Sequence, residues 1–154
     1  MRKIVNQVRD MELIEKELQS SLAGVLVLNL TSEKFVQIVT PYIYKDKNIF
    51  IFFNNDNELA SGIHFDSIVS FTVMRYGKAR KTKNIDYDPS YNVFSITIRG
   101  VVRKVDDSKV INDLQQNYIQ KYKKTINDKI DMSFLSNIII IDTEEIQAFE
   151  ETGG

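Results

Sequence analysis

The chain has 154 residues, a length typical of one domain, and its hydrophobic fraction of 43% excludes a disordered protein. Its formal net charge of −1 gives no overall field that would draw it onto nucleic acid or an anionic membrane. With no cysteine and one histidine it lacks the usual ligands of a zinc site, so we predict no metal centre and a reducing, cytoplasmic environment. Its apolar runs are too short to span a bilayer, and its first residues lack the apolar stretch of a signal peptide.

The first predicted element is an amphipathic helix over about residues 7–22. Apolar side chains recur there every three or four residues, with charged residues between them: Val8, Met11, Ile14, Leu18 and Leu22. A buried strand is predicted next, over residues 25–30, and a polar turn follows it.

The second predicted strand runs from residue 35 to about residue 44 and contains Pro41. Because proline has no N–H, this position must face a sheet edge, a bulge or a ligand. The third strand, 48–53, is apolar on both faces and runs directly into the polar cluster 54–58. We expect a short helix over 58–65, whose positive dipole end and free N–H groups would favour a phosphate.

The second half of the chain predicts strands at 67–74 and 93–105, joined by a long polar segment over 75–92. Gly100 falls on the apolar face of the later strand and is expected to let it bend around a barrel corner. A helix over about 107–124 follows an aspartate-rich N-cap, and a helical turn is expected at 128–135. The chain then gives a strand at 138–141, a short strand at 144–149 and an acidic tail.

These elements predict a single, mainly β domain over residues 1–154, with six or seven antiparallel strands and flanking helices. The strands at 35–44 and 48–53 carry apolar groups on both faces. One face of each can fill a barrel, and we expect a second subunit to cover the other, which makes a homodimer.

The order of elements from about residue 11 to residue 149 resembles the pyridoxamine 5′-phosphate oxidase-like family of FMN-binding split barrels. The resemblance rests on the apolar strand that ends at Asn54, the helix and strand after it, and the pattern of strand, glycine, strand and acidic helix start around Gly100. It implies a split β-barrel homodimer that binds FMN and acts as a flavin-dependent oxidoreductase.

The resemblance also implies positions for the cofactor. The isoalloxazine would lie between subunits near Thr40, Pro41 and Tyr42, and the phosphate would meet Asn54, Asn57 and Ser61. The family commonly places basic residues at two further phosphate positions, which are filled here by Gln37 and Leu59. Each lost charge-assisted bond weakens binding by about 1.5–3 kcal/mol.

The segment 75–92 offers replacement charge through Arg75, Lys78 and Arg80, on a loop that would cover the phosphate. The alternative is a solvated, mobile loop.

His64 would lie near the phosphate and could contact the ligand or ligate haem, or it is a partly buried structural histidine. Tyr42, Tyr44, Tyr118 and Tyr122 could stack on a flavin or belong to the core. Two other functions stay open: a non-enzymatic protein that holds haem, a deazaflavin or another flat anionic ligand, and a cofactor-free dimer with an interaction role.

Overall fold

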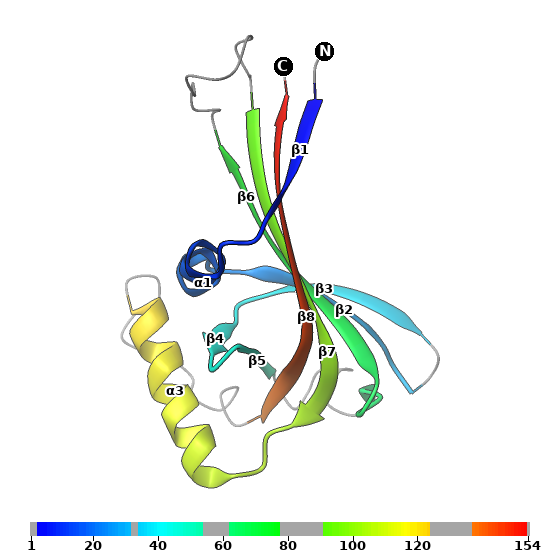
Figure 1. The fold of residues 1–154 in the computed structure, drawn as a ribbon. Coiled ribbons are helices and arrows are strands. Elements are labelled where there is room, and N and C mark those ends of the chain that lie inside the picture. The colour runs from blue at the N-terminus through cyan, green and yellow to red at the C-terminus, as the bar shows by residue number, and fades with distance from the viewer. Residues whose placement is uncertain (1–2, 32–33, 54–61, 78–90, 124–136, 154) are drawn as a thin grey trace.

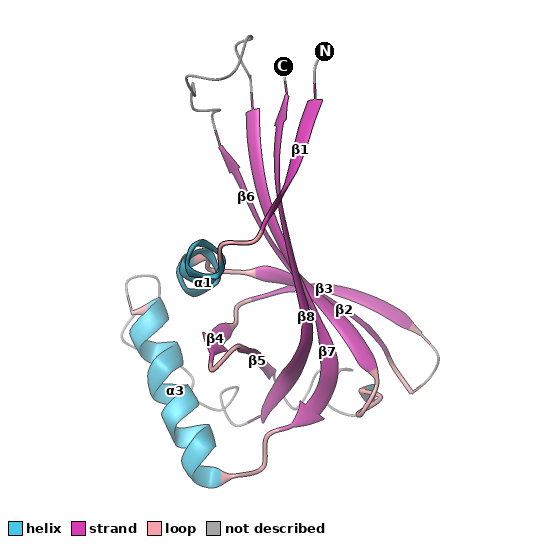
Figure 2. Cartoon of the chain, in the orientation of Figure 1, coloured by secondary structure: helices cyan, strands magenta, loops and turns pink. Residues whose placement is uncertain are grey.

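A computed structural model describes residues 3–31, 34–53, 62–77, 91–123 and 137–153 (Figures 1 and 2). These residues form one antiparallel sheet in the order β3-β2-β6-β7-β8-β5-β4, with β1 on β8, and two helices. The elements are β1 (Lys3–Val8), α1 (Met11–Ser20), β2 (Gly24–Asn29), β3 (Phe35–Thr40), β4 (Ile43–Lys45), β5 (Asn48–Phe53), β6 (Ile68–Gly77), β7 (Tyr91–Lys104), α3 (Ser108–Tyr122) and β8 (Asn137–Gly153). The predicted class, a split β-barrel with flanking helices, is confirmed, with eight strands instead of six or seven.

The two ends of the chain differ from the prediction. The first helix begins at Met11 instead of residue 7, because the Asp10 carboxylate caps it by accepting hydrogen bonds from the N–H groups of Glu12 and Leu13. The residues before this cap form β1, which pairs along the end of β8. The predicted strands at 138–141 and 144–149 are one strand, because β7 and β1 both offer backbone partners that extend β8 to Gly153.

β7 and β8 form the longest ladder of the sheet, and Gly100 interrupts it with a β-bulge between Arg99 and Gly100. A Cβ at Gly100 would lie 2.1 Å from the carbonyl oxygen of Asp142. Only glycine allows this approach of the two backbones, and bulges sharpen the bend and twist of a strand. The expectation that Gly100 marks a bend is confirmed.

We predict that Gly100→Ala lowers the free energy of unfolding by about 1–3 kcal/mol, because the added methyl group forces the β7 and β8 backbones apart. Gly77→Ala is the matched control, since a Cβ at Gly77 meets nothing within 4 Å. Urea denaturation of both variants measures the difference. Equal stability of the two variants would contradict the close approach at Gly100.

The sheet curls, and the strands at the two ends of its main order are neighbours in sequence. β3 lies at one end of this order and β4 at the other, and only Pro41 and Tyr42 separate them along the chain. The single strand predicted over 35–44 is therefore broken at Pro41, where the missing N–H ends the β3 ladder. The barrel is split at this point, and the backbone crosses the split from one edge to the other.

Two apolar cores result from this curl. Alternate residues of β5 point to opposite sides: Ile49, Ile51 and Phe53 join Ile14 and Leu18 of α1 inside the barrel. Phe50 and Phe52 join a second core with α3, through Leu114, Tyr118, Tyr122, Ile43 and Ile138. The expectation that a second subunit covers the far face of 48–53 is wrong, because α3 covers it.

Some predicted segments cannot be compared with the structure. Residues 54–61 and 78–90 lie outside the described residues, and so does the helical turn expected at 128–135. Three other predicted boundaries shift. The helix expected to reach residue 65 ends earlier, since Ile63 bridges Leu30 as an isolated β-pair. β6 and β7 continue to Gly77 and from Tyr91, so the segment between them is shorter than the predicted 75–92.

Candidate functional site

The described helices leave the outer face of β3, β2, β6 and β7 uncovered, and this face carries several large apolar side chains. Its large exposed side chains are Phe35, Val39, Ile68, Met74 and Tyr76, with exposed fractions from 58% to 74%. These side chains stand on alternate positions, while their neighbours in sequence fill the barrel. A group of exposed apolar side chains on one face is typical of an interface or a ligand site.

The strand register arranges this face in rows. One row runs Gln37, Val27, Ser70 and Arg99 across the four strands. The next row runs Val39, Val25, Thr72 and Thr97, and the hydroxyls of Thr72 and Thr97 lie 3.1 Å apart. The face therefore combines apolar groups with a few polar side chains near its middle, which suits a flat, partly polar ligand.

A shallow groove with a volume of about 190 Å³ lies at one end of this face. Phe35 and Ile68 give it apolar walls, and Asn29, Ser70 and Arg99 give it hydrogen-bond donors. It combines a cation with amide and hydroxyl groups, a set that can bind an anionic oxygen.

The predicted phosphate segment returns to the described chain at this same end. Asn54, Asn57, Leu59 and Ser61 themselves lie outside the described residues. Gly62, the next residue, accepts a hydrogen bond of 2.7 Å from the N–H of Thr31, just beyond β2. Asn29 of the groove is the last residue of β2, so Gly62 and the groove lie at the same end of that strand.

Arg99 is the groove residue that sequence reasoning missed. Its guanidinium lies 3.5 Å from a carboxylate oxygen of Glu145, and both side chains are about half exposed, so the pair is weak. The alternation of β7 puts Arg99 on the face opposite its buried apolar side chains. Only the register of β7 against β6 and β2 brings it into one row with Gln37.

The residues expected near the isoalloxazine lie at the opposite end of β3. Thr40 is 8% exposed, and its hydroxyl donates to the Pro41 carbonyl at 3.0 Å, while Pro41 itself is exposed. Tyr42 is completely buried and packs edge-on against Phe71, with ring centroids 4.9 Å apart. The Tyr42 ring therefore presents no open face for stacking and has a packing role.

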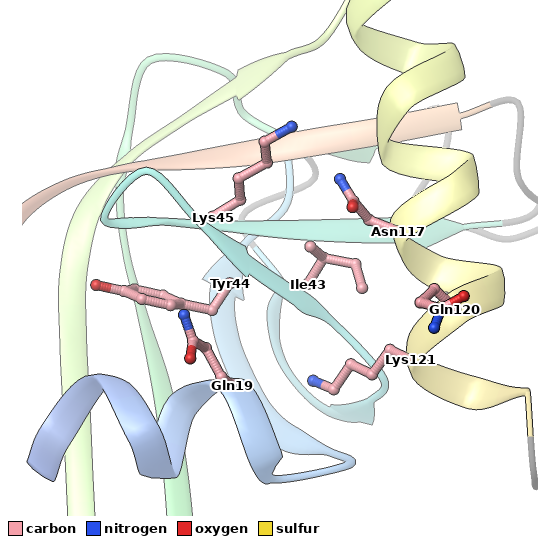
Figure 3. Close-up of a pocket in the computed structure, with 7 residues that line it drawn as sticks. All are labelled: Gln19, Ile43, Tyr44, Lys45, Asn117, Gln120 and Lys121. Carbon is pink, nitrogen blue, oxygen red and sulfur yellow. The ribbon is translucent and has the colours of Figure 1, made fainter.

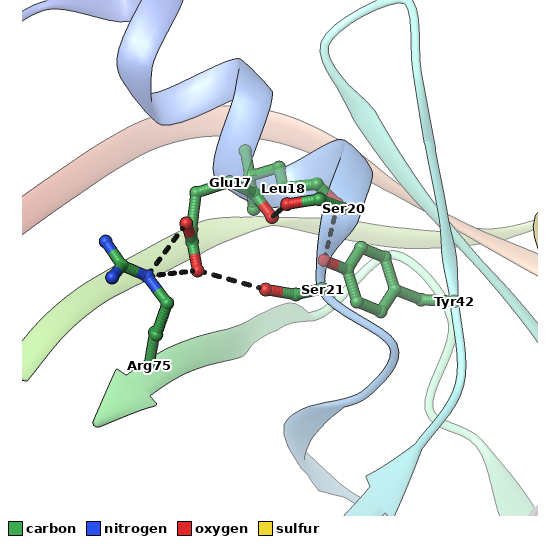
Figure 4. A network of polar contacts seen from close by, with 6 residues as sticks. All are labelled: Glu17, Leu18, Ser20, Ser21, Tyr42 and Arg75. Atoms are coloured by element: carbon green, nitrogen blue, oxygen red, sulfur yellow. Dashed lines mark hydrogen bonds and ion pairs between the residues drawn. The ribbon is translucent and has the colours of Figure 1, made fainter. Parts of the chain in front are cut away.

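Tyr42 joins both helices to the split of the barrel, and Figure 4 shows its contact with α1. Its hydroxyl donates to the Leu18 carbonyl of α1 at 2.5 Å, and its N–H donates to the Tyr122 hydroxyl of α3 at 3.1 Å. The Tyr122 hydroxyl donates in turn to the Leu22 carbonyl at 2.7 Å. From α3, the Lys121 ammonium projects toward β4 (Figure 3), donates to the Tyr42 carbonyl at 3.0 Å and lies 3.8 Å from the Tyr42 ring centroid.

Burial shifts the ionisation of this cluster. Removal from water raises the pKa of Tyr42, with the nearby Tyr122 adding to the rise, and it raises the pKa of Tyr122 to about 12. The same effect lowers the pKa of Lys121 to about 8. The four tyrosines that could have stacked on a flavin all belong to the two cores, with exposed fractions of 8% or less.

Arg75 belongs to β6 and not to a covering loop. Its Nε lies 3.1 Å from both carboxylate oxygens of Glu17, and this pair ties α1 to the sheet (Figure 4). Lys78 and Arg80 lie outside the described residues. Arg75 therefore does not lie on a loop that covers the phosphate, and its guanidinium pairs with Glu17 instead.

His64 is exposed, so the alternative of a partly buried histidine is wrong. Its backbone carbonyl accepts a hydrogen bond of 2.5 Å from the Ser67 hydroxyl, which fixes the turn into β6. Across the described residues, no three His, Asp or Glu side chains are placed to hold a metal ion.

We predict opposite outcomes for two conservative substitutions on neighbouring tyrosines. Tyr42→Phe leaves the buried Leu18 carbonyl without its donor and lowers the free energy of unfolding by about 1–3 kcal/mol. The Tyr44 hydroxyl is buried without a hydrogen-bond partner in the described part of the protein, so Tyr44→Phe changes stability by less than about 0.5 kcal/mol or increases it. Urea denaturation compares them, and a larger loss for Tyr44→Phe would contradict the assignment.

No family model matches the sequence, and no curated protein matches it. Solved structures do match its fold. A candidate 5-nitroimidazole antibiotic resistance protein from Bacteroides thetaiotaomicron aligns with a TM-score of 0.74 and 10% identity, over 99% of this chain and 90% of that one. An FAD-binding protein from Mesorhizobium loti aligns with a TM-score of 0.66 and 16% identity, over 96% and 98%.

A candidate pyridoxamine 5′-phosphate oxidase from Corynebacterium glutamicum aligns with a TM-score of 0.58 and 21% identity, over 97% of this chain and 95% of that one. The chain has the fold of these split barrels. Identities this low show the fold alone, and the expected resemblance in fold is confirmed. No helix in the described ranges is both long and apolar enough to cross a membrane.

Proposed function

We propose that this chain binds FMN between two copies of itself and uses it in a cytoplasmic oxidoreduction. The observation that carries the proposal is the alignment of nearly the whole chain with nearly the whole of proteins named FAD-binding, such as the one from Mesorhizobium loti. Its own outer sheet face adds independent support, because it exposes large apolar side chains and has a groove lined by Arg99 at one end.

The dimensions of this face suit the cofactor. β3 has six residues and spans about 17 Å from Phe35 to Thr40, at about 3.3 Å per residue. The phosphate would lie at the Phe35 end, between the groove and the segment that carries Asn54, Asn57 and Ser61. The isoalloxazine would then lie over the row of Val39 and Val25, beside Thr40 and Pro41.

Arg99 supplies the charge that Gln37 and Leu59 do not. In this arrangement its guanidinium leaves the weak pair with Glu145 and donates to the phosphate. The hydroxyls of Ser70 and Thr72 lie on the adjacent strand and offer neutral donors along the cofactor. The residues present therefore fit an anionic, flat ligand.

A bound flavin supplies the hydride chemistry by itself. The protein's share is to bind the cofactor, to orient it and to exclude water from it. The outer face performs the last task only when it is covered, since Val39 and Phe35 are 74% and 65% exposed in the single chain. A second copy of the same face would cover it and would complete the site.

The first test is a titration with FMN in which binding is monitored through the flavin absorbance at about 450 nm. We expect the parent protein to bind FMN and Arg99→Gln to weaken binding by about tenfold or more, because a charge-assisted hydrogen bond is lost. Asn54→Asp should weaken it too, by placing a like charge beside the phosphate.

Arg103→Gln and Asn112→Asp are the matched controls. Arg103 lies on β7 and pairs with Asp142 and Asp66, and Asn112 is an exposed residue of α3. Both should bind FMN as the parent does. If the parent protein does not bind FMN but gives a Soret band with haem, the haem-binding alternative is favoured. If it binds neither FMN nor a deazaflavin nor haem, a cofactor-free interaction protein is favoured.

A further inference from the structure

A second pocket lies away from the outer sheet face, between α1 and α3 and over β4 (Figure 3). Its volume is about 370 Å³, within the range of about 300–1,000 Å³ that is usual for small-molecule sites. Seven of the described residues line it: Gln19, Ile43, Tyr44, Lys45, Asn117, Gln120 and Lys121.

The lining has a single sign of charge. Of the lining residues that the structure describes, Lys45 and Lys121 are the only charged ones, and none is a carboxylate. Among the described residues, neither lysine forms an ion pair. Burial raises the pKa of Tyr44, and the charge of Glu15 on α1 adds to the rise, but Glu15 does not line the pocket. The electrostatics of this pocket therefore select an anion.

The remaining lining gives the pocket an apolar floor and a polar rim. Ile43 and Tyr44, two buried residues of β4, lie at the floor; the Ile43 side chain points toward α3, and the Tyr44 ring points into the barrel core. Figure 3 shows Gln19 of α1 beside the Tyr44 ring, with Asn117 and Gln120 on α3. Carboxamides donate and accept hydrogen bonds, so they can orient a ligand without adding charge.

Lys121 is held in place before any ligand arrives. One of its three N–H donors is used by the Tyr42 carbonyl, and the ammonium rests on the Tyr42 ring. Burial has already removed part of its water shell, and this lowers its pKa to about 8 while leaving it mostly protonated at neutral pH. A partly desolvated, fixed cation with free donors gains more from an anion than a mobile surface lysine does.

We propose that the pocket between α1 and α3 binds a small aromatic carboxylate, with its carboxylate on Lys121, its ring against Ile43, and the carboxamides at its rim. This site is separate from the FMN site of the outer face and does not depend on it. Lys45 adds positive charge from β4, and a bound ligand would bridge α1 and α3.

The experiment is a titration of the full chain with 2-naphthoate at about pH 6.5, in which NMR monitors the chemical shifts of the side-chain NH₂ groups. We expect shifts at Gln19, Asn117 and Gln120. Lys121→Met should weaken binding about tenfold to a hundredfold through the lost charge-assisted hydrogen bond. Lys123→Met removes the same charge from an exposed residue two positions along the chain and should bind as the parent does.

Two further measurements keep the test decisive if Lys121→Met does not fold. Lys45→Met should weaken binding by a smaller factor, and the uncharged 2-naphthamide should bind the parent at least about tenfold more weakly than 2-naphthoate. The proposal is overturned if 2-naphthoate does not bind at millimolar concentration, or if 2-naphthamide binds equally well. Shifts confined to residues of β2 and β3 would overturn it too, since they would place the probe on the outer face.

Discussion

The split of the barrel at Tyr42 is the constraint on which the rest of the structure depends. Pro41 ends one edge of the curled sheet, and Tyr42 carries the chain to the other edge while it fills the gap between them. Every polar group of Tyr42 has a partner on one of the two helices: the Leu18 carbonyl on α1, and Tyr122 and Lys121 on α3. One residue therefore joins sheet and helices, and it fixes which faces of the sheet the helices can reach.

This arrangement leaves the outer face of β3, β2, β6 and β7 bare. α1 closes the interior of the barrel, and α3 lies over the far side of β5. Since both helices pack on other faces of the sheet, no part of the described chain covers the apolar outer face around Val39. A second copy and a flat cofactor are the occupants that our proposal assigns to it, with Arg99 at its charged end.

Local patterns were enough to predict the elements whose neighbours lie close in sequence or whose side chains alternate strictly. The two-faced β5, the alternation of β7, the bend at Gly100 and the helix after Asp107 were of this kind. β1 and the full length of β8 escaped prediction, because their residues are mostly polar or half exposed and their pairing partners lie at the far end of the chain. A short stretch of sequence could not predict that α3 covers β5. It also could not predict that Arg99 lies in one row with Gln37, because both features depend on contacts between residues far apart in the chain.

The mass of the protein in solution, measured by light scattering during gel filtration, tests the central claim about the bare face most directly. We predict a dimer of about 36 kDa, twice the chain mass of 17.8 kDa, and a folded monomer for Val39→Glu, which buries a charge in the proposed contact. Val110→Glu, on the exposed side of α3, should leave the dimer intact. A parent protein that remains monomeric, or a Val39→Glu variant that dimerises as strongly as the parent, would contradict the account.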